Sequence, residues 1–141
     1  MHYVVDASVA AKWLLPEQHS ARAELLLANG TSLSAPDLLY SEVANVLWKR
    51  VLRGEVTEES ADAGLALLLQ IEIDITPARE IIAEAFAITC RFERTVYDAV
   101  YLALALEEDA VLVTSDQRLC NAVRGTALKD HIRWLGDVSS T

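Results

Sequence analysis

The sequence predicts a three-layer α/β/α domain with a short central parallel sheet. Helical segments alternate with short apolar strands along the chain, which is typical of parallel α/β domains. Two strands, Tyr3 to Val5 and Ala110 to Val113, are continuous apolar runs, as expected for strands buried on both faces of a sheet. Each run leads into an acidic residue, Asp6 or Asp116. Ligands of open α/β sheets bind beyond the carboxyl ends of strands, so a candidate site is predicted there.

Length and composition favour one folded domain over residues 1–141, since the chain is near the modal size of a domain and 52% of its residues are hydrophobic. The net charge of −9 opposes nonspecific attraction to nucleic acid, so any such contact has to be local. An acidic surface that only keeps the protein soluble is the alternative.

No membrane span is predicted, because the most apolar stretch, Val96 to Leu106, is too short for a bilayer and contains Asp98. No signal peptide is expected either, because the start lacks a basic segment followed by an apolar one. We therefore expect a cytosolic protein without a membrane partner. Cys90 and Cys120 lie in predicted helices without C-x-x-C spacing, and we interpret them as buried thiols in a reducing compartment.

In the first half of the chain, turn and capping residues delimit the elements. Pro16 stops the first helix, Gly54 ends the third, and Thr57 is typical of an N-cap for the fourth. The predicted order is a strand over 3–6, helices over 8–15 and 17–28, a strand over 31–35, and helices over 38–53 and 57–69.

The second half repeats the alternation. Ile71, Ile73 and Ile75 alternate with acidic residues, which predicts a strand with one wet face at the sheet edge. Pro77 opens the next helix, and Thr95 is the expected N-cap of the one after it. The predicted order continues with helices over 77–92 and 95–108, a strand over 110–113, a helix over 117–123 and a strand over 132–134.

The acids that follow the two apolar runs have two compatible interpretations. Asp6, like Ser8, is a good N-cap for the next helix, and Asp116 with Ser115 is another. Neighbouring parallel strands lie about 4.8 Å apart, so carboxylates at two adjacent strand ends can also share a cation.

Two further acids lie on apolar helices. Glu42 shares a face with Asn45, Lys49 and Arg53 on a helix that is apolar nearly all round and that we expect to be largely buried. This stripe is either a solvated face, which is favoured for Lys49 and Arg53, or part of a site. Asp98 is the one charged residue from Thr95 to Leu106, and either a metal or a capping role at the helix start explains it.

Clustered carboxylates without nearby His or Cys select Mg²⁺ or Mn²⁺ over zinc. Four segments that carry these residues resemble PIN-domain ribonucleases: Val5 to Ser8, Glu42 to Asn45, Asp98 to Ala103, and Thr114 to Asp116. Within that family, the opening segment from Val5 to Glu17 is most similar to VapC-type toxins of prokaryotic toxin–antitoxin pairs.

The resemblance implies a PIN-like fold and an endoribonuclease that uses Mg²⁺ or Mn²⁺, forms a homodimer and is held inactive by a cognate antitoxin. Asp6 and Asp98 would hold the metal, and Glu42 and Asp116 would complete its shell or orient the attacking water. Ser8 and Thr114 would support the site. The alternative is a non-catalytic RNA-binding or regulatory PIN-like module, against which the four retained acids argue.

Overall fold

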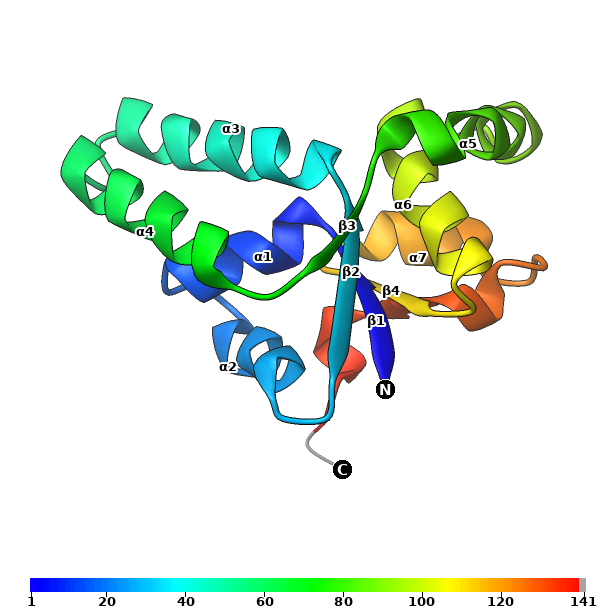
Figure 1. Ribbon diagram of the computed structural model, residues 1–141, viewed down its shortest axis with the longest axis horizontal. Coiled ribbons are helices and arrows are strands. Elements are labelled where there is room, and N and C mark those ends of the chain that lie inside the picture. The colour runs from blue at the N-terminus through cyan, green and yellow to red at the C-terminus, as the bar shows by residue number, and fades with distance from the viewer. Residues whose placement is uncertain (140–141) are drawn as a thin grey trace.

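Figure 1 shows the computed structural model, in which five parallel strands form one sheet with the order β3-β2-β1-β4-β5. The structure describes residues 1–139, so the last two residues of the expected 1–141 domain lie outside the described residues. Helices cover both faces of the sheet: α1, α3 and α4 lie on one side in Figure 1, and α5, α6 and α7 on the other. The predicted three-layer α/β/α class is confirmed.

The strands are β1 (His2–Val5), β2 (Ser32–Pro36), β3 (Asp74–Thr76), β4 (Val111–Thr114) and β5 (Ile132–Trp134). The helices are α1 (Ala7–Leu14), α2 (Ser20–Glu24), α3 (Leu38–Leu52), α4 (Glu58–Gln70), α5 (Ala78–Phe92), α6 (Val96–Glu107) and α7 (Gln117–Val123). Three short 3-10 turns lie at Leu25–Leu27, Lys129–His131 and Leu135–Asp137.

The core sits around the two central strands. Val4 and Val5 of β1 and Leu112 and Val113 of β4 are fully buried, because helices pack on both faces of these strands. This burial confirms the prediction from the continuous apolar runs. Helix α6 packs against β1, β2 and β4, which brings the start of α6 close to the carboxyl ends of the central strands.

Threonine caps set the starts of two helices as predicted. The hydroxyl of Thr57 accepts a hydrogen bond from the N–H of Ser60 at 3.0 Å, and that of Thr95 accepts one from the N–H of Asp98 at 3.1 Å. After α3, Gly54 adopts a φ of 73°, a left-handed conformation that glycine takes without steric cost.

The predicted helix over 17–28 is wrong in extent, because α2 begins only at Ser20 and gives way to a 3-10 turn at Leu25. Glu17 lies outside the helix, where it forms ion pairs with Lys12 and Arg50. His19 has a φ of 67°, which interrupts the helical path. The strand predicted over 71–75 is confined to β3, although its place at the sheet edge is confirmed.

Two burial predictions are also wrong. Helix α3 is not largely buried: it packs Leu39, Val43 and Leu47 into the core but leaves Trp48 56% exposed. Apolar residues on nearly all faces of α3 therefore did not lead to burial of all its faces. Cys90 is exposed, whereas Cys120 is buried as expected.

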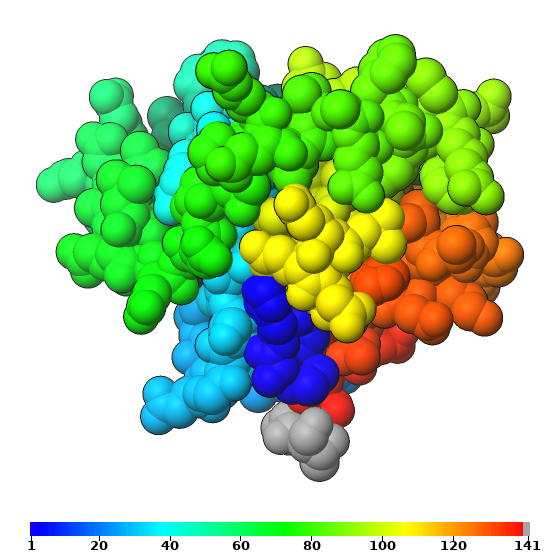
Figure 2. Space-filling view, turned by 45° about the vertical axis from the view of Figure 1, so that its right-hand side comes forward, coloured from blue at the N-terminus to red at the C-terminus, as the bar shows by residue number. Residues whose placement is uncertain are grey.

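The amino end of the sheet is closed by contacts between distant segments. Figure 2 shows the chain start in blue beside the segment around Glu108 in yellow. The His2 Nε2 atom lies 2.9 Å from Glu108 Oε2 and 2.7 Å from the Ser34 hydroxyl.

Within residues 1–139, no helix is long and apolar enough to cross a membrane.

Candidate active site

The first two site residues follow neighbouring strands. Strands β1 and β4 pair in parallel, with Val5 opposite Val113. Asp6 comes directly after β1, and Asp116 comes two residues after the end of β4. Their carboxylates therefore approach the same edge of the sheet, as the order of the elements predicted.

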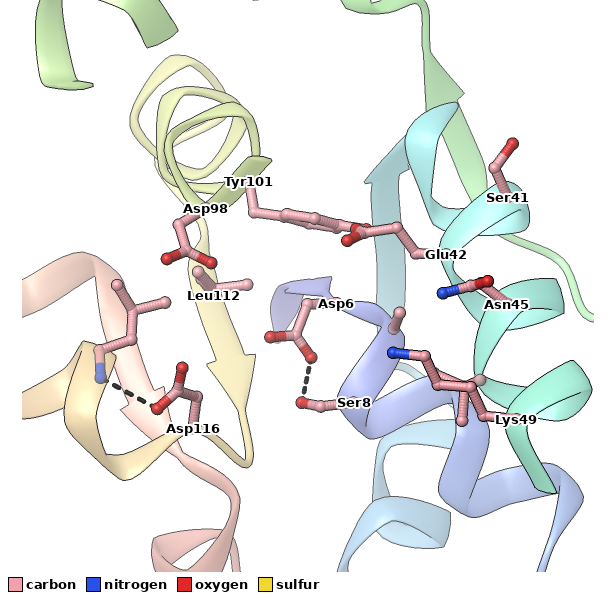
Figure 3. Close-up of a pocket in the computed structure, with 13 residues that line it drawn as sticks. Asp6, Ser8, Ser41, Glu42, Asn45, Lys49, Asp98, Tyr101, Leu112 and Asp116 are labelled. Atoms are coloured by element: carbon pink, nitrogen blue, oxygen red, sulfur yellow. Dashed lines mark hydrogen bonds between the residues drawn. The ribbon is translucent and has the colours of Figure 1, made fainter. Parts of the chain in front are cut away.

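All four predicted carboxylates line one cavity of about 430 Å³. In Figure 3, Asp6 lies between Asp98 and Asp116 on one side and Glu42 on the other. Each acid comes from a different part of the chain: the end of β1, helix α3, the first turn of α6 and the start of α7. We call this space the acidic cavity. Its other lining residues are Ala7, Ser8, Ser41, Asn45, Val46, Lys49, Tyr101, Leu112 and Leu119.

Asp6 is half-buried and caps α1. Its Oδ1 atom accepts hydrogen bonds from the Ser8 hydroxyl at 2.6 Å and from the N–H of Val9 at 3.2 Å. Burial raises the pKa of Asp6 to about 6, and the charge of Glu42 adds to this rise. Hydrogen bonds from Ser8, Thr114 and Val9 oppose it. The capping and site interpretations of Asp6 are thus compatible in the same carboxylate.

Asp116 likewise caps its helix, since its Oδ1 atom accepts hydrogen bonds from the N–H groups of Arg118 at 3.0 Å and Leu119 at 3.2 Å. Asp98 differs, because the hydroxyl of Thr95 caps α6. Burial raises the pKa of Asp98, and the negative charge of Asp116 raises it further. The two acids therefore repel each other across the cavity.

Glu42 projects from α3 and meets Tyr101 of α6. The Tyr101 hydroxyl donates a hydrogen bond to Glu42 Oε1 at 2.6 Å. Burial, followed by the hydrogen bond to Glu42, raises the pKa of the Tyr101 phenol, so this group stays a neutral donor.

The remaining predicted residues separate into two groups. Asn45 and Lys49 line the acidic cavity along the same face of α3 as Glu42. Arg53 is exposed at the end of α3 and does not line the cavity. Thr114 is fully buried, and its hydroxyl accepts a hydrogen bond from the N–H of Asp116 at 3.1 Å.

Sequence reasoning missed Tyr101 and Ser41 among the lining residues. A signal for Tyr101 was present, because it follows Asp98 by three positions and residues at this spacing share a helix face. Ser41 directly precedes Glu42 and carried no comparable signal.

The donor set of the acidic cavity fits a divalent cation. Four carboxylates face the cavity, and Lys49 is the one cationic side chain among its described lining residues. Hard oxygen ligands are those preferred by Mg²⁺ and Mn²⁺. Among residues 1–139, no group of three or more His, Cys, Asp or Glu side chains lies close enough together to hold a metal ion.

The fold and the cavity define a class of protein: a parallel α/β domain with an acidic, cation-attracting site at the carboxyl edge of its central strands. The model of the PIN domain family matches residues 3–125, which contain all four carboxylates. The chain belongs to the PIN domain family.

Named relatives support this assignment. The chain is 37% identical over 121 residues to Ribonuclease VapC3 of Pyrobaculum aerophilum, covering 84% of this chain and 92% of that protein. It is 35% identical over 119 residues to Ribonuclease VapC1 of Mycobacterium tuberculosis, covering 84% and 89%. The crystal structure of PAE2754 from Pyrobaculum aerophilum is similar with a TM-score of 0.71 at 25% identity, covering 96% of this chain and 85% of that one. The resemblance noted in the sequence is confirmed.

Proposed function

We propose that this protein is an endoribonuclease of the VapC type that cleaves RNA with the help of Mg²⁺ or Mn²⁺. The observation that carries the proposal is the meeting of Asp6, Glu42, Asp98 and Asp116 in one cavity from four parts of the chain. Relatives named Ribonuclease VapC, at 35% and 37% identity over most of the chain, support it.

The carboxylates have distinct roles in this proposal. Asp6 and Asp98 hold the cation, while Glu42 and Asp116 complete its shell or orient the attacking water. When bound, the cation lowers the pKa of water and offsets charge that develops on the phosphate. Ser8 and Thr114 restrict the Asp6 carboxylate by hydrogen bonds.

The substrate is single-stranded or loop RNA, because unstacked nucleotides can enter a cavity that a duplex cannot. Lys49 and Asn45 lie beside the carboxylates on α3 and are placed to contact phosphates that flank the cleaved bond. The net charge of −9 disfavours RNA binding by the protein as a whole, and the positive charge of Lys49 provides a local attraction for phosphate at the cavity.

The proposed partners are a second copy of the chain and an antitoxin protein that blocks the site. Both follow from the resemblance to VapC-type toxins, which the relatives named Ribonuclease VapC support. We expect the antitoxin to be encoded directly beside this protein, and light scattering of the purified chain, alone and with that neighbouring gene product, tests the two partners separately.

The decisive experiment is cleavage of a cellular RNA pool by purified protein freed of antitoxin. We expect cleavage with Mg²⁺ or Mn²⁺, none with EDTA, and none from Asp6→Asn. Asp74→Asn is the matched control, because Asp74 is an exposed acid on the edge strand β3, away from the acidic cavity. If the protein binds RNA but does not cleave it with either Mg²⁺ or Mn²⁺, the result contradicts the proposal and favours a non-catalytic module.

A further inference from the structure

Tyr101 reaches toward the acidic cavity from α6 and donates a hydrogen bond to Glu42 Oε1 on α3 at 2.6 Å. The two residues are 59 positions apart in the chain. A distance of this length between a phenol and a carboxylate oxygen is typical of charge-assisted hydrogen bonds, which are about twice as strong as neutral ones. This contact therefore joins two helices at the point where Glu42 faces the cavity.

The two partners differ in their freedom to move. Tyr101 is 4% exposed as a whole residue and follows Ala99 and Val100, which are also buried. Its hydroxyl is consequently held in place by packing of the ring. Glu42 is half-buried and has a flexible side chain on the rim of the cavity. The rigid partner is therefore the tyrosine, and the partner whose orientation is determined is the glutamate.

The hydrogen bond also distinguishes the two oxygens of Glu42. Oε1 accepts the Tyr101 proton, whereas Oε2 takes no part in that bond. An ionised carboxylate has about four lone-pair sites, so the remaining sites stay available for a cation or a water molecule. A tyrosine at this position thus fixes the carboxylate without occupying it fully.

We propose that Tyr101 is a positioning residue that holds the Glu42 carboxylate in one orientation for the cation shell of the acidic cavity. The inference rests on the proposed function, because it takes Glu42 as a member of that shell. Tyr101 acts through Glu42 and contacts neither the cation nor the RNA. Partners in the outer shell of a metal site typically change metal affinity or activity by about 10- to 100-fold.

The test is Tyr101→Phe, which keeps the buried ring and removes the hydroxyl. We expect the dissociation constant for Mn²⁺, measured without RNA from the electron paramagnetic resonance signal of free Mn²⁺, to rise at least about tenfold. In cleavage of an RNA oligonucleotide, kcat should fall by about 10- to 100-fold while KM stays within about twofold. A thermal melt in EDTA establishes that the variant is folded. If Tyr101→Phe is not folded, the same measurements are made on Tyr101→Met, which also lacks the hydroxyl donor.

Tyr97→Phe is the matched control, because Tyr97 lies on the same helix, is 63% exposed and does not line the acidic cavity. It should behave as the wild type. A double-mutant cycle tests whether Tyr101 acts through Glu42. Once Glu42→Gln is present, adding Tyr101→Phe should change Mn²⁺ affinity by less than about twofold, since groups that act as a unit are not additive.

The outcomes separate the inference from the proposed function. If the wild type binds Mn²⁺ and cleaves RNA but Tyr101→Phe does the same with unchanged constants, the positioning role is overturned. A raised KM with unchanged kcat, or fully additive losses in the cycle, would also overturn it. A wild type that neither binds Mn²⁺ nor cleaves RNA would refute the proposed function, and the inference with it.

Discussion

The side chain of Ser8 is hydrogen-bonded to the backbone N–H of Ser115, 107 residues later in the chain, at 3.1 Å. The same hydroxyl donates its proton to Asp6 Oδ1 at 2.6 Å. One small residue therefore links the segment after β1 to the segment after β4 and restricts the first carboxylate of the cavity. Asp6 and Asp116 owe part of their relative placement to this link.

Replacing Ser8 by Ala should weaken both the fold and the site. The change leaves the Ser115 N–H without its hydroxyl partner and removes the hydrogen bond that most opposes the rise in the pKa of Asp6. We expect a loss of about 1–2 kcal/mol in the free energy of unfolding, measured by urea denaturation, and weaker Mn²⁺ binding. Ser60→Ala is the control. Equal stability and Mn²⁺ affinity in the Ser8 variant would contradict the linking role.

The metal-free protein should lose stability as the pH rises through the range in which Asp6 titrates. The pKa of Asp6 is raised from 3.8 to about 6, so the folded state binds this proton more tightly than the unfolded chain does. The Asp6 contribution to the free energy of unfolding is therefore full below about pH 4, falls up to about pH 6 and then stays low. The fall is at most about 3 kcal/mol, since one pKa unit corresponds to about 1.4 kcal/mol.

This pH effect is measured as a difference between two proteins, because other carboxylates titrate in the same range. Urea denaturation in EDTA from about pH 4 to pH 7 is compared for the wild type and Asp6→Asn, whose side chain does not titrate. We expect the free energy of unfolding of Asp6→Asn, minus that of the wild type, to increase with pH up to about 6. A difference that is constant with pH would exclude a raised pKa for Asp6.

Asp98→Asn should stabilise the metal-free protein and abolish cleavage. Burial and the charge of Asp116 make the ionised Asp98 unfavourable, and both effects disappear in the amide. The cap of α6 is retained, because Thr95 accepts its hydrogen bond from the backbone N–H of residue 98. We expect the melting temperature in EDTA to rise by about 3 °C, as for about 1 kcal/mol in a domain of this size.

The same variant should gain less stability from Mn²⁺ than the wild type, because a ligand stabilises the folded state in proportion to its affinity for it. Asp62→Asn, at an exposed acid on α4, is the control and should gain the full increment. If Asp98→Asn melts no higher than the wild type in EDTA and still gains the full Mn²⁺ increment, Asp98 is not a metal ligand.

Lys49 and Arg53 should differ in their effect on RNA binding, although they share a helix face. Lys49 lines the acidic cavity and Arg53 does not. Lys49→Ala should weaken binding and reduce the slope of log K against log salt by about one, the value expected for one lost phosphate contact. Arg53→Ala should change the slope less. Equal slopes in both variants and the wild type would place both residues on a solvated face.

Local sequence patterns were sufficient for the fold class, and they marked the four carboxylates as candidates that the resemblance to PIN-domain ribonucleases then grouped into one site. Continuous apolar runs predicted the buried strands β1 and β4, and Thr57 and Thr95 predicted helix starts that the structure confirms. These signals depend on a few neighbouring residues, because strand burial and helix capping are short-range effects. The alternation of strands and helices then implied a parallel sheet, and with it the edge where Asp6 and Asp116 meet.

Only the tertiary structure decided which side chains meet. The helix expected from Glu17 starts late, where Glu17 pairs with Arg50, 33 positions away. The exposure of Trp48 on α3 likewise depends on which other elements cover that helix. The contact between Tyr101 and Glu42 joins two helices, and the sequence of neither helix predicts its contact with the other. Such contacts arise from the packing of distant segments, and local periodicity determines only which face of a helix is available for them.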